Sequence, residues 1–244
     1  MRPFLLISFF IILTCIANGF NDKDTSAITT LPVIDIVEKR EYFFGTEKNV
    51  TKIDQKTINE HISSNLGELL ATAAPLHIQT YGANGSISSV SFRGTAADHT
   101  QINWNGIPIN SITLGQADLS TIPVYFTDEV LITHGSSGSL YGSGTFGGSI
   151  NLNNTAEWHN RYSINAKAEY GSFNDKRFAL QGKWCNSWLQ ARTTVFNHRS
   201  LNNFKYTDTY KFGNPLTEQS HNSLSYYGLL QNIFIKLPKN FKLE

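Results

Sequence analysis

The amino-acid sequence predicts an α+β domain followed by the first antiparallel strands of a transmembrane β-barrel. In the first part, one helical pattern is mixed with short strand-like runs and glycine-rich turns. From Trp158 onward, apolar and polar residues alternate with a period of two, over segments of the length that membrane strands need. An apolar segment at the N-terminus is the third observation, because it predicts export from the cytoplasm.

Residues 1–19 have the pattern of a secretory signal peptide. A short positive start is followed by an apolar core at 4–16 and by small residues such as Ala17, where a peptidase can cut. The core is too short to span a bilayer, and a short membrane anchor is the alternative interpretation. A lipoprotein would use Cys15, but Thr14 is a poor residue before that cleavage site.

The composition argues against several functional classes. The net charge of the 244 residues is +1 and no block of Lys and Arg occurs, so no nucleic-acid partner is expected. After removal of the signal peptide only Cys185 remains, which excludes an intramolecular disulfide and gives no metal-site spacing. No H-E-x-x-H or G-x-S-x-G motif is present, and the acid and base Asp98 and His99 are sequence neighbours that point in different directions. We expect no enzyme, no catalytic residue, no metal and no cofactor.

A flexible leader is predicted at 20–45, since residues 21–30 are polar and lack periodicity. It contains a short apolar island at 31–37, followed by charged residues. An extended segment of this kind can add itself to the edge of a partner's sheet. An ordinary edge strand of the next domain is the alternative. The apolar residues of the island are Leu31, Val33, Ile34, Ile36 and Val37.

A helix is predicted to begin after Asn65 and to end before Pro75. Asn65 and Glu68 have the spacing of a capping box, and apolar residues recur at helical spacing from Leu66 to Ala73. Strands are expected at 88–92 and 101–104. Between the second of these and the apolar run at 107–109, Asn105 and Gly106 predict a tight hairpin turn, because both central residues of such a turn need positive φ.

The segment 135–148 reads GSSGSLYGSGTFGG, with six glycines and four serines. Gly142, Gly144 and Gly147 match the dinucleotide fingerprint G-x-G-x-x-G, but the preceding strand candidate at 130–133 ends too early. The following residues, 149–153, resemble a strand where a helix would be required to hold the pyrophosphate. The sequence therefore argues against a dinucleotide site.

Alternation predicts strands at 162–170, 178–184, 189–195 and 224–237, with a long loop over 197–222. One face of each strand is apolar and the other is polar or charged, which fits a membrane barrel, although a soluble sandwich also alternates. The last residues, 239–244, continue a strand-like pattern, so we expect 156–244 to be the N-terminal strands of an incomplete barrel.

Five blocks of sequence resemble, in order and spacing, the plug domain of TonB-dependent transporters, over about residues 46–155. The blocks are 66–70 (LGELL), 90–94 (VSFRG), 104–109 (WNGIPI), 119–124 (LSTIPV) and 140–152 (LYGSGTFGGSINL). The resemblance implies a plug inside a barrel of roughly 22 strands in the cell outer membrane. It also implies that the island at 31–37 is a TonB box, which pairs with the energy-transducing protein TonB.

The sequence departs from the family at two positions. Asn105 stands where the family usually has Asp in the hairpin, which keeps the turn and loses a charge. His134 stands where an arginine usually precedes the glycine-rich stretch and helps to tie the plug to acidic groups of the barrel. Arg93 is retained, so the resemblance implies plug anchoring by Arg93 and, when it is charged, by His134.

The resemblance implies active import of a scarce, bulky nutrient such as cobalamin or a ferric siderophore, and the plug blocks are most similar to those of cobalamin-receptor-like members. The loops at 81–84 and 110–116 are the candidate ligand contacts, and Tyr81, Gly82 and Asn84 are the residues singled out there. The expected partners are TonB, outer-membrane lipid and the small ligand. A non-transporting ligand-binding or signalling receptor that shares the plug is the alternative.

Overall fold

A computed structural model of the chain describes residues 50–135, 142, 144–159, 161–237 and 242–243. The predicted signal peptide and the island at 31–37 lie outside these residues. In the part of the chain that is described, no helix is long and apolar enough to cross a membrane.

The α+β domain contains a five-stranded sheet in the order β1-β6-β7-β4-β5. Its strands are β1 (Val50–Lys52), β4 (Thr100–Trp104), β5 (Ile107–Pro108), β6 (Glu129–His134) and β7 (Gly148–Asn153). β4 and β7 are parallel, and the other neighbours are antiparallel. β2 (His77–Thr80) and β3 (Ser88–Ser91) form a separate hairpin.

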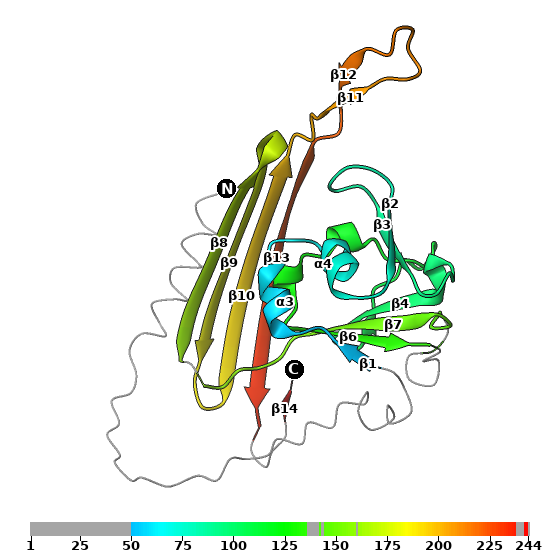
Figure 1. The fold of residues 1–244 in the computed structure, drawn as a ribbon. Helices are drawn as coiled ribbons and strands as arrows, with labels where there is room; N and C mark the ends of the chain where they lie inside the picture. The colour runs from blue at the N-terminus through cyan, green and yellow to red at the C-terminus, as the bar shows by residue number, and fades with distance from the viewer. Residues whose placement is uncertain (1–49, 136–141, 143, 160, 238–241, 244) are drawn as a thin grey trace. The chain divides into compact units, whose positions relative to one another are not determined.

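Two short helices pack with this sheet, α3 (Gln55–Glu60) and α4 (Leu66–Ala73) (Figure 1). The predicted cap of α4 is present: the Asn65 side chain accepts a hydrogen bond from the Glu68 amide at 2.9 Å and donates one to the Glu68 carboxylate at 3.2 Å. Short 3₁₀ turns complete the domain: η1 (Ala97–His99), η2 (Leu119–Thr121) and η3 (Val124–Phe126). The core is apolar and includes Ile58, Leu66, Leu69, Leu70, Phe92, Ile102, Leu119, Ile132, Ile150 and Leu152.

A two-residue turn joins β4 to β5 at Asn105 and Gly106, where φ is +48° and +82°. Both values lie in the left-handed region, which Gly enters freely and Asn tolerates better than most residues. The Asn105 side chain also accepts a hydrogen bond from the Asn154 amide at 2.8 Å. The turn is thereby tied to the chain that leaves the domain.

A second sheet follows, entirely antiparallel, in the order β14-β13-β10-β9-β8. Its strands are β8 (Tyr162–Gly171), β9 (Asp175–Cys185), β10 (Leu189–Ser200), β13 (Leu224–Lys236) and β14 (Lys242–Leu243). A tight turn that contains η4 (Ser172–Asn174) joins β8 to β9, and three residues join β9 to β10. These strands agree with the prediction and extend it, since β10 continues to Ser200.

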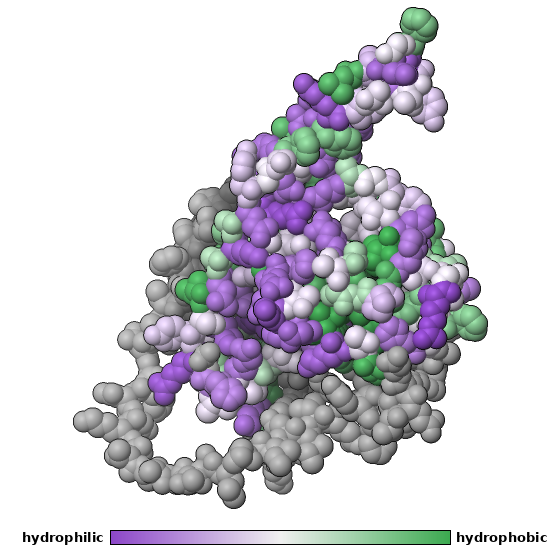
Figure 2. All heavy atoms as spheres, in the orientation of Figure 1, coloured by the Kyte–Doolittle hydropathy of each residue, from purple (hydrophilic) through white to green (hydrophobic). Residues whose placement is uncertain are grey.

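The connection from β10 to β13 is long and contains a small hairpin, β11 (Lys205–Thr207) and β12 (Leu216–Glu218). This hairpin forms an arm beyond the ends of the long strands (Figure 1). Figure 2 shows hydrophobic residues on this arm. Phe212, in the loop between β11 and β12, and Leu216 of β12 are exposed. The sequence predicted a loop over 197–222 and missed the hairpin, because strands of three residues give no clear alternation.

Candidate functional site

Alternate residues of the second sheet point toward the α+β domain, and most of these are polar. Along β10, every second residue from Gln190 to Ser200 is buried, including the charged Arg192 at 5% exposure. The opposite face is apolar and exposed: Ile164 is 77% exposed and Leu229 is 70% exposed. A water-soluble sandwich would bury its apolar face, so this distribution is that of membrane strands with a polar interior.

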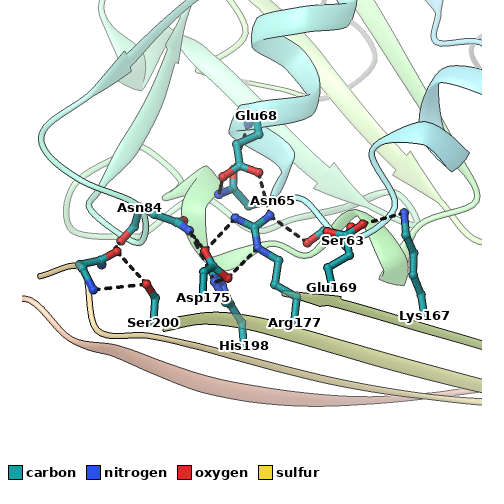
Figure 3. Close-up of polar contacts among 11 residues, drawn as sticks. Ser63, Asn65, Glu68, Asn84, Lys167, Glu169, Asp175, Arg177, His198 and Ser200 are labelled. Atoms are coloured by element: carbon teal, nitrogen blue, oxygen red, sulfur yellow. Dashed lines mark hydrogen bonds and ion pairs between the residues drawn. The ribbon is translucent and has the colours of Figure 1, made fainter. Parts of the chain in front are cut away.

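The first polar contact with the α+β domain lies at the end of β9 nearest the β8–β9 turn, and we call it the Asp175 cluster (Figure 3). It consists of Glu68, Asn84, Asp175, Arg177 and His198. Arg177 donates to the Glu68 carboxylate at 3.2 Å and to the Ser63 carbonyl at 3.2 Å. Asp175 accepts hydrogen bonds from Arg177, from His198 at 3.0 Å and from Asn84 at 2.8 Å. Residues from helix α4, from the β2–β3 loop and from two strands therefore meet in one network.

The second polar contact lies toward the other end of the same strands, and we call it the Asp128 cluster. Arg192 binds the Asp128 carboxylate with both terminal nitrogens, at 2.9 and 2.6 Å, a bidentate geometry that is strong for this pair. Asp128 also accepts the Thr155 amide at 2.8 Å. Nearby, Lys183 contacts Glu157 at 2.6 Å, and this hydrogen bond lowers the pKa of Glu157. The cluster holds the segment through which the chain passes from the domain into the strands.

A small apolar contact completes this surface. The η3 residues Tyr125 and Phe126 pack against Ala179 and Phe196 of the strands, and the Tyr125 hydroxyl donates to the Asn165 carbonyl at 3.1 Å. Burial raises the pKa of Tyr125, so its hydroxyl stays protonated and able to donate.

A close approach of ring and backbone occurs at Gly228 of β13. A Cβ placed there would lie 2.8 Å from the Phe126 ring, so only glycine leaves room for the ring at this point.

The predicted ligand-loop residues lie in the β2–β3 loop. Tyr81 is 64% exposed, and Gly82 is exposed beside it. Asn84 instead joins the Asp175 cluster, and its backbone carbonyl accepts a second hydrogen bond from Asn202 at 2.8 Å. The loop therefore has an exposed part and a part that is attached to the strands. Ligand binding by these residues stays a prediction.

The predicted anchoring residues are near one another at a different edge of the domain. His134 shares a hydrogen bond of 3.0 Å with Thr51 and packs edge-on against Phe92. Burial and the charge of Arg93 lower the pKa of His134. Arg93 itself is exposed and adopts φ +47°. Anchoring of a plug by this pair stays a prediction.

Of the residues in the two clusters, only Asn84, as a ligand contact, and Glu68, in the helix cap, were singled out from the sequence, and neither was expected to contact the strands. The available signal was a charge on the polar face of an amphipathic strand, as at Arg177, Lys183 and Arg192. Glu68 and Arg177 are 109 residues apart, and Asp128 and Arg192 are 64 apart, so no local pattern predicts which pairs form. Among the described residues, no group of three or more His, Cys, Asp or Glu side chains could hold a metal ion.

Comparison with protein families finds a match to the TonB-dependent receptor plug domain over residues 44–149. The chain is similar to the vitamin B12 transporter BtuB of Vibrio vulnificus, with 29% identity over 136 residues, and to that of Vibrio cholerae, with 31% identity over 136 residues. Each alignment covers 56% of this chain and 19% of the relative. The chain thus spans about a fifth of the length of these relatives.

Solved structures show the same fold. The pyoverdine outer membrane receptor FpvA from Pseudomonas aeruginosa superposes with a TM-score of 0.64 at 15% identity, covering 80% of this chain and 26% of that one. The siderophore receptor PiuA from Acinetobacter baumannii gives 0.59 at 19% identity, covering 78% and 24%. Since coverage of this chain extends beyond the matched 44–149, the likeness includes strands of the second sheet as well as the α+β domain.

Proposed function

We propose that the full-length protein, whose residues 44–149 match the plug domain of TonB-dependent receptors, is an outer-membrane receptor that imports a bulky nutrient, cobalamin or a ferric siderophore. Import would proceed by an energy-coupled rearrangement of the plug. Family members are transporters and receptors, which supports the general role in transport. The names of the relatives supply the two ligand classes.

The polar contact between the plug and the strands is the observation that carries the proposal. Arg177 and Arg192 are held by plug carboxylates instead of by apolar packing. Water can replace such partners when the plug moves, whereas separating an apolar interface of the same area would expose hydrophobic surface. A polar interface therefore suits a plug that must both seal and rearrange.

The work for this rearrangement is proposed to arrive through the island at 31–37. The outer membrane has neither ATP nor a sustained ion gradient, so energy has to be delivered mechanically from the periplasm. An extended apolar segment can pair as a strand with a partner such as TonB and transmit a pull. The exposed residues Tyr81 and Gly82 are proposed to contact the ligand on the plug.

The test uses the full-length receptor in cells that lack their own vitamin B12 receptor. Labelled cyanocobalamin is one probe and a labelled ferric siderophore is the other, each measured for surface binding and for uptake. Deletion of residues 31–37 should abolish uptake and leave surface binding unchanged. Deletion of residues 22–28, an equal length of polar leader, is the matched control and should leave both unchanged.

Two results would contradict the proposal. Uptake that survives the deletion of 31–37 would show that this segment does not couple energy to transport. A receptor that reaches the outer membrane and binds neither probe would rule out the proposed ligand classes.

A further inference from the structure

Asp175 is the residue at which the strands hold two separate parts of the plug. One of its carboxylate oxygens accepts from Arg177 Nε at 3.3 Å and from His198 Nε2 at 3.0 Å. The other accepts from Asn84 Nδ2 at 2.8 Å and from Arg177 Nη2 at 3.5 Å. A carboxylate offers about four acceptor positions, so all of them are used. Figure 3 shows Asp175 between these three donors.

The two parts of the plug reach Asp175 by different routes. The β2–β3 loop reaches it directly, through the Asn84 side chain. The first turn of α4 reaches it through Arg177, whose Nη1 binds Glu68 at 3.2 Å while its Nε binds Asp175. The Arg177 guanidinium therefore binds both Glu68 of the helix and Asp175, the carboxylate that holds the loop.

Direct packing between the helix and the loop is loose. A cavity of about 170 Å³ is lined by Glu68 and Ala71 of α4 and by Ala83, Asn84 and Ser86 of the loop. The Asn84 side-chain oxygen has no hydrogen-bond partner among the described residues. Beside this cavity, α4 is linked to Asn84 through Arg177 and Asp175 of the strands.

Neutral contacts hold the loop as well. Asn202 donates to the Asn84 carbonyl at 2.8 Å, and the Leu224 side chain packs on Gly85. These contacts do not involve α4, so they fix the loop and leave it independent of the helix. The contact of Asn84 with Asp175, in contrast, links the loop to α4 through Arg177.

We propose that Asp175 is a positioning residue that couples the ligand-facing loop 81–86 to helix α4, so that release of the helix from Arg177 also loosens the loop and lowers ligand affinity. The effect on ligand affinity rests on the proposed function. The link between the loop and the helix rests only on the contacts described above. Transport would gain from this link, because a plug that has begun to rearrange would also release its ligand.

The first experiment needs no ligand. A spin label at Ile87→Cys, with Cys185 and every other cysteine of the mature full-length receptor replaced by serine, reports the mobility of the β2–β3 loop. Asp175→Asn should increase this mobility, since an amide cannot accept the four hydrogen bonds of the carboxylate. Asp128→Asn is the control: it weakens a different contact between plug and strands, the one with Arg192, and should leave the label unchanged.

The second experiment measures the coupling itself. Glu68→Gln weakens the hold on Arg177 and should raise label mobility when Asn84 is present, but not in an Asn84→Ala background, where the loop has already lost its link to Asp175. Asn84→Ala leaves the pair of Asp175 and Arg177 intact, so it remains informative if Asp175→Asn prevents assembly. The proposal would be overturned if, in the protein that retains Asn84, the spin label were equally mobile with and without Glu68→Gln.

The third experiment uses cyanocobalamin binding as the readout of affinity. Loss of a hydrogen bond to a charged group should weaken binding about tenfold in Asp175→Asn and change it less than twofold in Asp128→Asn. Equal weakening in both variants would overturn the specific role of Asp175. A wild-type receptor that binds no cyanocobalamin would count against cyanocobalamin as the ligand. The spin-label experiments would then decide whether the loop is coupled to helix α4.

Discussion

The plug domain and the strands of the second sheet bury opposite kinds of side chain. The plug hides Leu66, Leu69 and Leu70 completely and keeps a mostly hydrophilic surface on the face in Figure 2. The strands hide Arg192 and His198 and expose residues such as Tyr162. The difference follows from the surroundings, because lipid accepts an apolar outer face and the polar plug accepts polar partners. The plug therefore buries apolar side chains and the strands bury polar ones, and the four variants below test these two patterns of burial.

The largest effect is expected in the plug core. Leu69→Ala leaves a cavity at a fully buried position and should lower the free energy of unfolding of the plug by about 2–5 kcal/mol. Thr72→Ala, on the exposed side of the same helix, is the control and should change it by less than about 0.5 kcal/mol. Urea titration with hydrogen exchange of the β4 amides measures both. Equal effects at the two positions would contradict an apolar core here.

A charged residue on the outer face of the strands should destabilise the protein in a bilayer. Leu180 lies in the middle of β9 on the exposed apolar face, and Leu180→Arg should cost about 2–4 kcal/mol in a bilayer. Gln181→Arg is the control, since the neighbouring residue faces the polar interior beside Thr194. Unfolding in lipid vesicles measures the difference. Tolerance of arginine at 180 would show that this face does not contact lipid.

The apolar contact between plug and strands should respond to volume. Gly228→Ala places a methyl group against the Phe126 ring and should destabilise the seated plug by about 1–3 kcal/mol. Phe126→Leu should relieve part of this cost in the double variant, which a double-mutant cycle detects. Strictly additive effects would mean that the two residues do not meet in the assembled receptor.

The smallest effect concerns acid pH. The pKa of His134 is lowered below its usual value of 6.5, so the folded plug binds this proton less tightly than the unfolded chain does. The contribution to stability is therefore complete above about pH 6.5 and is lost as the pH falls below it. His134→Gln should reduce the loss of stability between pH 8 and pH 5, measured as the shift in urea midpoint. If His134→Gln loses as much stability between pH 8 and pH 5 as the unchanged protein does, other titratable groups cause the loss.

Helix ends and turns could be predicted from the sequence where a single residue type determines the local backbone conformation. The cap at Asn65 and the turn at Asn105 and Gly106 follow from side-chain chemistry and positive φ within a few residues. Helix α3 was not predicted, because its six residues bury only Ile58 and show no periodicity. The β1 strand, three residues long, escaped prediction for the same reason.

The candidate site could be predicted only in part. Sequence reasoning identified the loop at 81–84 and expected ligand contact there, while the structure adds that Asn84 is attached to the strands. The partners of Arg177 and Arg192 could not be derived, since a charge on a strand carries no information about which distant carboxylate it will meet.

The sequence by itself determined that the second half forms alternating strands with one apolar and one polar face, and that the first half has the helix cap and turns of a plug. Only the tertiary structure decided which face of the strands is buried, because alternation is the same whether the apolar face meets a core or lipid. It also decided that Asp175 joins a loop and a helix. That contact depends on the relative position of four segments, and no local pattern of residues specifies it.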